Sequence, residues 1–279
     1  MALELQRYNW NMTTSHNHIP NKIAGVLCAR IFVAVAASIW FTSSSVTALA
    51  EIQSKQADSR RALSQKRGIV TRAMILEAQE RLIDLGYWIG EAEGKWGEAS
   101  RAGLIAFQKV ENRPRTGKLT AAELQALNAA SRPSPLERGS AHIEVDLKRQ
   151  VLFVVDAGGA ISKILPVSTG DGKMFTVDDY TQPAVTPTGR FHVYRKLPGW
   201  RKSPLGLLYY PNYIVGGIAI HGNPSVPAQP ASHGCVRIPM FAAEEFSEMT
   251  PIGTEVIVHD GGAASARDSP SLPQTWNHR

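Results

Sequence analysis

Residues 142–167, HIEVDLKRQVLFVVDAGGAISKILPV, decide the class of fold. Apolar and polar residues alternate from Ile143 to Leu147, and a second apolar run from Val151 is followed by a turn and a third run. This period of two is typical of β-strands. Other strand-like runs lie at 190–194, 213–220 and 255–259, and one helical run lies at 241–249. About six short strands with turn signals predict a β-sandwich or barrel with one attached helix.

Upstream of this β region, residues 71–127 show a helical pattern. Apolar residues recur at steps of three and four from Met74 to Leu85, and a second such run centres on Phe107. A third begins at Thr120, with Glu123 at the spacing of a capping box. Three helices within about sixty residues predict a small N-terminal module that folds independently.

Composition places the chain among ordinary globular proteins. Of its 279 residues, 43% are hydrophobic and 19% are charged, which excludes wholesale disorder and collagen-like structure. The net charge of +6 is spread along the chain without a Lys/Arg-rich block, so we expect no nucleic-acid partner. A basic protein that faces an anionic cell-wall polymer fits this charge pattern.

The first fifty residues predict a secretory signal. The apolar segment 23–41 is interrupted by Arg30, and its uninterrupted part, 31–41, is short for a spanning helix of ~20 residues. Lys22 precedes the segment, and the small-residue motif ALA at 48–50 suits a cleavage site. Cleavage would leave no membrane-spanning segment. The alternative is an uncleaved anchor.

Composition shifts define the other boundaries. Residues 51–68 are polar and residues 131–139 hold two prolines and a glycine, so both are interpreted as linkers. The tail, 261–279, has the composition of a disordered segment. Two folded parts remain, a helical module at 69–130 and a mainly β domain at 140–260.

Two short motifs carry the candidate chemistry, IHGNP at 220–224 and ASHGCVR at 231–237. Removal of the signal takes out Cys28 and leaves Cys235 as a single thiol in an oxidising compartment, where thiols tend to pair. A cysteine is nucleophilic as thiolate and needs a base, which His221 could supply. The glycines in both motifs expose N–H groups of the kind that form an oxyanion hole.

The residues alone leave two other interpretations of Cys235 open. It could be an inert buried thiol. It could also bind zinc with His221 and His233, although His233 and Cys235 are very close in sequence and no clear fourth ligand lies nearby.

Both folded parts resemble known families. The module resembles the three-helix peptidoglycan-binding domain, through QERLIDLGY at 79–87, GKWG at 94–97, AFQK at 106–109 and TGKLT at 116–120. Residues 142–259 resemble the catalytic domain of the L,D-transpeptidases, the YkuD family, through TPTGRF at 186–191, IHG at 220–222 and SHGCVR at 232–237.

The second resemblance implies a β-sandwich-like YkuD fold and a set of site residues. Cys235 would be the nucleophile and His221 the general acid and base, with neither metal nor cofactor. The backbone around His233, Gly234 and Cys235 would form the oxyanion hole. Substrate contacts are expected from three further residues, Arg237, Ser232 and Tyr209. For these the alternatives are a structural ion pair, a turn-forming role and core or lid packing, respectively.

The implied function is that of an exported enzyme of the periplasm or cell wall, with peptidoglycan stem peptides and glycan as partners. It would cleave the stem-peptide bond to the terminal D-alanine through a thioester and transfer the acyl group to an amine. The alternatives are an L,D-carboxypeptidase, a wall-protein anchoring enzyme and a non-catalytic peptidoglycan-binding protein. The helical module is expected to be a wall anchor separate from the chemistry, so a chain that begins near Ser140 should remain active.

Overall fold

The computed structural model describes residues 49–56, 58–59, 69–177 and 179–261. The chain divides into two units, Met1–Leu63 and Ser64–Arg279. In the first unit the described residues are helical and exposed. Residues 1–48 of the expected signal and residues 262–279 of the expected tail lie outside the described residues.

Within the described residues, no helix combines the length and the apolar composition needed to cross a membrane.

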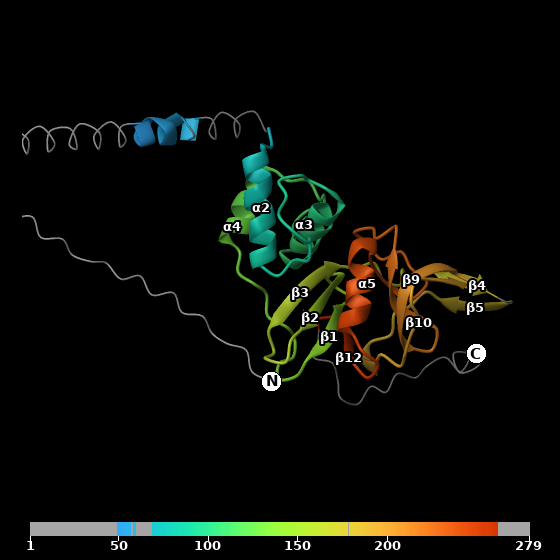
Figure 1. Cartoon of the computed structure of the whole chain (residues 1–279). Coiled ribbons are helices and arrows are strands. Elements are labelled where there is room, and N and C mark those ends of the chain that lie inside the picture. Colours follow the sequence, from blue (N-terminus) through green and yellow to red (C-terminus); the bar gives the residue numbers. More distant parts are fainter. Residues whose placement is uncertain (1–48, 57, 60–68, 178, 262–279) are drawn as a thin grey trace, which may run out of the picture. The chain divides into compact units, whose positions relative to one another are not determined.

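Three helices form the N-terminal part of the second unit (Figure 1): α2 (Arg72–Asp84), α3 (Glu98–Val110) and α4 (Ala121–Ala129). The Thr71 hydroxyl accepts a hydrogen bond from the Met74 N–H at 3.3 Å and so caps α2. The Thr120 hydroxyl accepts from the Glu123 N–H at 3.2 Å and caps α4, at the start that the sequence predicts.

A five-stranded sheet follows in the chain. Its order is β3 (Ile161–Pro166), β2 (Val151–Val155), β1 (His142–Asp146), β12 (Glu255–His259) and β6 (Gly189–His192). Only β1 and β12 pair in parallel; the other neighbours are antiparallel. Strand β2 is buried on both faces because Leu152 and Val154 face the β core, whereas Val151, Phe153 and Val155 face the helices.

The second sheet carries the candidate chemistry. Its order is β11 (Val236–Pro239), β10 (Ile218–Asn223), β9 (Gly206–Val215) and β7 (Arg195–Lys196), and β8 (Trp200–Ser203) also pairs with β9. A separate hairpin consists of β4 (Met174–Val177) and β5 (Tyr180–Pro183). Helix α5 (Met240–Met249) packs on β9 and β10 (Figure 1), and this is the one attached helix expected for the β domain.

The two five-stranded sheets share one apolar core. It includes Val145 and Leu152 of the first sheet, Ile220 and Ile238 of the second, and Phe246 of α5. The predicted class, a mainly β domain, is therefore confirmed. The sequence missed several short strands, β4, β5, β7 and β8, because their side chains are largely exposed and carry no apolar alternation.

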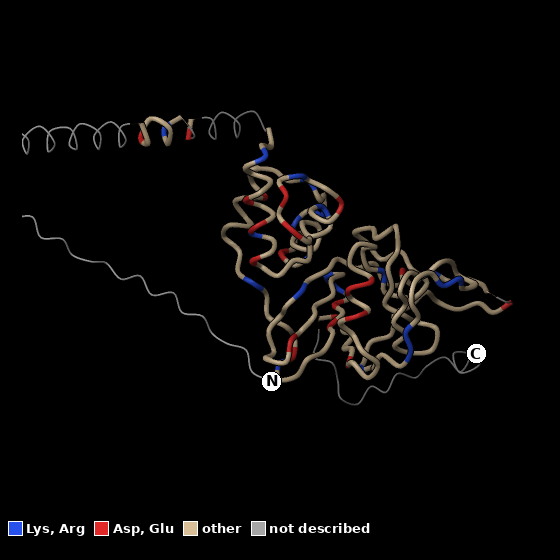
Figure 2. The backbone as a smooth tube through the Cα atoms, viewed as in Figure 1, with Lys and Arg blue, Asp and Glu red and all other residues tan. Residues whose placement is uncertain are grey.

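Charges of both signs are interspersed over the described residues. Figure 2 shows Lys and Arg side by side with Asp and Glu on both the helical and the β part. Within the described residues, the excess of positive charge is therefore not concentrated in one patch.

The helical module is not an independent body, which corrects the prediction from sequence. Leu82 and Phe107 of the helices share a core with Phe153, Ile161 and Ile164 of the sheet. The backbones are also joined at the edge strand β3, where Ile164 donates to the Gly86 carbonyl at 2.8 Å and accepts from the Trp88 N–H at 3.0 Å. The helices cover the outer face of the sheet.

A chain that begins at Ser140 should therefore fold poorly. It would expose Val151, Phe153, Ile161 and Ile164, each at most 1% exposed. Burying such a side chain contributes about 1.5–3 kcal/mol, so four approach the whole unfolding free energy of a domain, about 5–15 kcal/mol. Solubility and thermal melting, compared with a chain of residues 69–261, measure this. Equal melting of the two chains would contradict it.

Candidate active site

Parallel pairing of β10 with β11 brings the two candidate catalytic residues together. In the register, Ile220 lies opposite Val236 and His221 opposite Arg237. Cys235 immediately precedes β11, and its Sγ accepts a hydrogen bond from the Ala219 N–H at 3.5 Å. The thiol thus lies against the backbone of β10 two residues before His221, so both candidate groups belong to the same stretch of this strand pair.

Irregular pairing surrounds His221. The register between β9 and β10 shifts on both sides of the pair Ala219–Ile220, between Ile218 and Ala219 and again between Ile220 and Gly222. Such bulges re-aim side chains and are common beside active sites. Gly222 also allows a close approach, since a Cβ there would lie 2.6 Å from the Cβ of Ala243 on α5.

His221 is held in one tautomer. Its Nδ1 lies 2.9 Å from the Gly222 carbonyl oxygen. A carbonyl can only accept, so Nδ1 carries the proton and Nε2 keeps its lone pair. Burial, opposed by the Gly222 hydrogen bond and assisted by the Arg237 charge, lowers the pKa of His221 to about 4. His221 is therefore neutral at pH 7 and able to accept a proton.

The thiol is also neutral at rest. Burial raises the pKa of Cys235, while the hydrogen bond from Ala219 and the positive charge of Arg237 oppose this rise. Both candidate groups are therefore in their neutral forms at pH 7, with no preformed thiolate–imidazolium pair.

Ser232 organises the turn before the cysteine. Its hydroxyl donates to the Cys235 carbonyl at 2.6 Å and accepts from the Gly234 N–H at 3.0 Å, and the residue is 3% exposed. This geometry agrees with the turn-forming role considered for Ser232. The hydroxyl proton is already used in a hydrogen bond within the loop. The Gly234 N–H is also used, in its hydrogen bond to the Ser232 hydroxyl. Of the backbone donors expected for an oxyanion, those of His233 and Cys235 remain.

Thr186 is a functional candidate to which the sequence analysis gave no role. Its hydroxyl donates to the Gly234 carbonyl at 2.7 Å and accepts from the Gly170 N–H at 2.9 Å. Gly170 in turn bridges to Ser232. Only glycine suits position 234, because its φ is +135° and a Cβ would lie 2.9 Å from the Val185 carbonyl oxygen. The TPTGRF motif that contains Thr186 was the available signal.

Arg237 stands on β11 opposite His221. Among the residues that the structure describes, no carboxylate forms a salt bridge with it. The structural ion pair considered for Arg237 is therefore not found there. Its half-buried guanidinium remains available to an anionic ligand.

Aromatic side chains flank the site. Tyr209 pairs with Gly222 across β9 and β10, and its ring lies 4.9 Å from that of Trp200, which is 52% exposed. From the β4–β5 hairpin, the Phe175 ring lies 4.7 Å from the His233 ring. Tyr209 thus joins a partly exposed aromatic cluster beside β10, and the His233 ring packs against that of Phe175.

Within the described part of the chain, no three His, Cys, Asp or Glu side chains cluster in a way that could hold a metal ion.

Comparison with known proteins defines the class. The model of the L,D-transpeptidase catalytic domain, YkuD, matches residues 140–258, and that of a peptidoglycan-binding domain matches residues 71–127. An L,D-transpeptidase from Xylanimonas cellulosilytica is 38% identical, with a TM-score of 0.63; the match covers 66% of this chain and 92% of that one. One from Stackebrandtia nassauensis is 23% identical, with a TM-score of 0.40, and the match covers 66% and 89%. Curated proteins give no match.

The fold and these matches define a peptidoglycan-modifying enzyme with an N-terminal peptidoglycan-binding domain. More particularly, the chain belongs to the YkuD family of L,D-transpeptidases.

Replacement of Thr186 tests how the cysteine turn is held. Thr186→Val keeps the shape but leaves the Gly234 carbonyl and the Gly170 N–H without their partner. We expect the unfolding free energy to fall by about 1–3 kcal/mol and covalent modification of Cys235 to slow. Denaturant unfolding and intact-mass kinetics measure the two effects. The exposed Thr188→Val is the matched control, and equal behaviour of both variants would remove Thr186 from the site.

Proposed function

We propose that this enzyme cleaves the bond between the third residue and the terminal D-alanine of a tetrapeptide stem and transfers the acyl group to an amine of another stem. The observation that carries the proposal is the neutral pair of Cys235 and His221, in which the Gly222 carbonyl fixes the proton on Nδ1 and leaves Nε2 free. This arrangement suits a cysteine nucleophile with a general base.

In the first half-reaction, the Cys235 sulfur attacks the carbonyl carbon as its proton passes to Nε2 of His221. The amides of His233 and Cys235 stabilise the tetrahedral oxyanion. The C–N bond then breaks, His221 returns the proton to the departing amine of D-alanine, and a thioester to Cys235 remains.

In the second half-reaction, an amine of a neighbouring stem attacks the thioester. His221 accepts the amine proton and returns it to the sulfur as the C–S bond breaks, which restores the thiol. Water in place of the amine would make the enzyme a carboxypeptidase, and an amine of a protein would make it an anchoring enzyme.

Arg237 would bind the carboxylate of the terminal D-alanine. The support is its position opposite His221 and the absence of a salt-bridge partner among the described residues. Guanidinium and carboxylate form paired, charge-assisted hydrogen bonds. Tyr209, with its neighbour Trp200, would line the groove for the rest of the stem, since amphipathic rings suit a partly exposed binding surface.

Export would bring the enzyme to this substrate. The apolar segment at 23–41 and the ALA motif at 48–50 support a signal that directs the chain to the periplasm or cell wall. The match to a peptidoglycan-binding domain supports the same location.

Mass analysis of products from a disaccharide-tetrapeptide tests the reaction itself. We expect loss of D-alanine, a transient adduct on Cys235 and a cross-linked dimer. A tripeptide without dimer would indicate hydrolysis in place of transfer. No change of the tetrapeptide would contradict the proposed reaction.

Two substitutions separate the nucleophile from the base. Cys235→Ala should abolish the adduct, whereas His221→Ala should slow its formation on the order of 10²-fold or more, because the base is lost. The residual rate of His221→Ala should rise only above about pH 8.5, the usual pKa of a thiol, because burial raises the pKa of Cys235. Intact-mass kinetics measure this, with the exposed His192→Ala as control. An essential His233 with a dispensable His221 would reverse the assignment.

The pH profile follows from the pKa of His221. Protonated His221 cannot accept the thiol proton, so adduct formation should stay level from neutral pH down to about 5 and fall below about 4. The raised pKa of the thiol should leave no rise in rate between pH 6 and 8. Single-turnover rates, with circular dichroism as a check on folding, measure this. An acid limb near pH 6.5 would contradict the neutral pair.

A further inference from the structure

A buried lysine joins the helical module to the catalytic domain. Lys109, in the last turn of α3, is 1% exposed. Its ammonium donates to the Gln150 carbonyl at 3.0 Å and to the Val167 carbonyl at 2.8 Å. These two residues stand just before β2 and just after β3, so the lysine connects α3 with the ends of two strands of the first sheet.

Hydrogen bonds continue from this point to the catalytic turn. The Gln150 side chain donates to the Thr169 hydroxyl at 2.6 Å and accepts from the Thr169 N–H at 3.0 Å. The Thr169 carbonyl accepts from the N–H groups of Ala231 and Ser232, both at 2.9 Å. Ser232 then holds the Cys235 carbonyl. An unbroken series of contacts therefore runs from the module to the nucleophile.

A second connection starts from the loop after α3. Arg115 donates to the Ala228 carbonyl at 3.0 Å and to the Gln229 side-chain oxygen at 3.4 Å. The Gln229 carbonyl also accepts from the Ser168 hydroxyl at 2.8 Å. Residues 224–235 form the crossover between β10 and β11, so Arg115 holds the segment that leads into Cys235.

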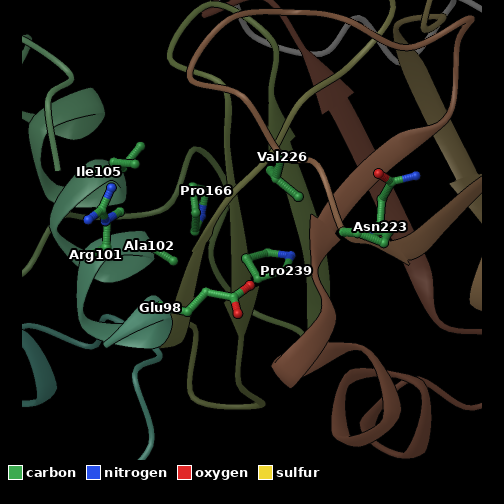
Figure 3. A pocket seen from close by; sticks show the side chains of 9 residues that line it. Glu98, Arg101, Ala102, Ile105, Pro166, Asn223, Val226 and Pro239 are labelled. Atoms are coloured by element: carbon green, nitrogen blue, oxygen red, sulfur yellow. The ribbon is translucent and has the colours of Figure 1, made fainter. Parts of the chain in front are cut away.

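Between these contacts, helix α3 and the catalytic domain are not in continuous contact. A cleft of about 140 Å³ lies between them. Figure 3 shows side chains that line it, Glu98, Arg101 and Ile105 of α3 and Pro166, Asn223 and Val226 of the catalytic domain. Along this side of the interface, specific polar contacts rather than continuous apolar packing link α3 to the crossover.

Such a connection is costly for stability. Both hydrogen-bond partners of Lys109 are carbonyls, and no carboxylate among the described residues forms a salt bridge with it. Burial, with the charge of Arg115 second, lowers the pKa of Lys109 to about 7. A buried amine in place of an apolar side chain destabilises a core, so its contribution here is one of geometry.

We propose that Lys109 and Arg115 are positioning residues for Cys235, so that the peptidoglycan-binding module is a structural part of the active site as well as a binding domain. The inference rests on the proposed function. Misplacement of reacting groups by about 1 Å can cost on the order of 10²-fold in rate. Loss of either connection should therefore slow acyl transfer without weakening substrate binding.

The first test is Lys109→Met, which keeps the unbranched stem and removes the ammonium. We expect thioester formation from the disaccharide-tetrapeptide to slow about 10-fold or more at saturation, with KM unchanged. Alkylation of Cys235 by iodoacetamide, which needs no oxyanion hole, should change by less than about twofold. Lys118→Met, an exposed lysine of the same module, is the control and should behave as wild type.

The second test is Arg115→Ala, which leaves the shared core intact and stays informative if Lys109→Met fails to fold. We again expect a lower kcat at unchanged KM, with partial recovery in Arg115→Lys. Arg101→Ala, the same charge change on the cleft side of α3, is the control. Normal kcat in folded Arg115→Ala would overturn the inference, as would a loss shared equally by the controls. A wild-type chain that forms no thioester would instead refute the proposed function.

Discussion

The parallel pairing of β10 with β11 is the constraint on which the site depends. Parallel neighbours need a crossover connection, and here the crossover ends at Cys235 itself. The position of Cys235 therefore depends on the last turn of the crossover. Ser232 holds it from within, and Thr186 holds it from the segment before β6. Glycine at 234 allows the backbone to approach Val185 closely enough for these bonds to form.

Burial decides the electrostatics of the catalytic pair. Both His221 and Cys235 are shifted toward their neutral forms because the surrounding core desolvates charge, and Arg237 is the one positive group that acts on both. In the proposed mechanism, the chemistry depends on a fixed proton position rather than on a preformed ion pair. The Gly222 carbonyl provides that position, and it needs no side chain to do so.

The relation between the module and the catalytic domain changes how the protein's architecture is understood. Strand β2 contributes one face to the β core and the other to the helices, so neither part has a complete core alone. The backbone hydrogen bonds at Ile164 extend this contact between helices and sheet to the edge strand β3. Under the proposed function, a module fixed in this way would hold the active site at a defined distance from bound peptidoglycan.

The sequence by itself determined the strand alternation, the three helices and the family, and it singled out Cys235 and His221 as the candidate pair, because local periodicity and short motifs depend on neighbouring residues. Other features were decided by tertiary structure. The Ser232 hydroxyl and the Gly234 N–H satisfy each other, Thr186 reaches the turn from 48 residues away, and Lys109 lies buried against carbonyls of a second domain. No local pattern encodes these, since each partner is brought close only by the packing of sheets and helices.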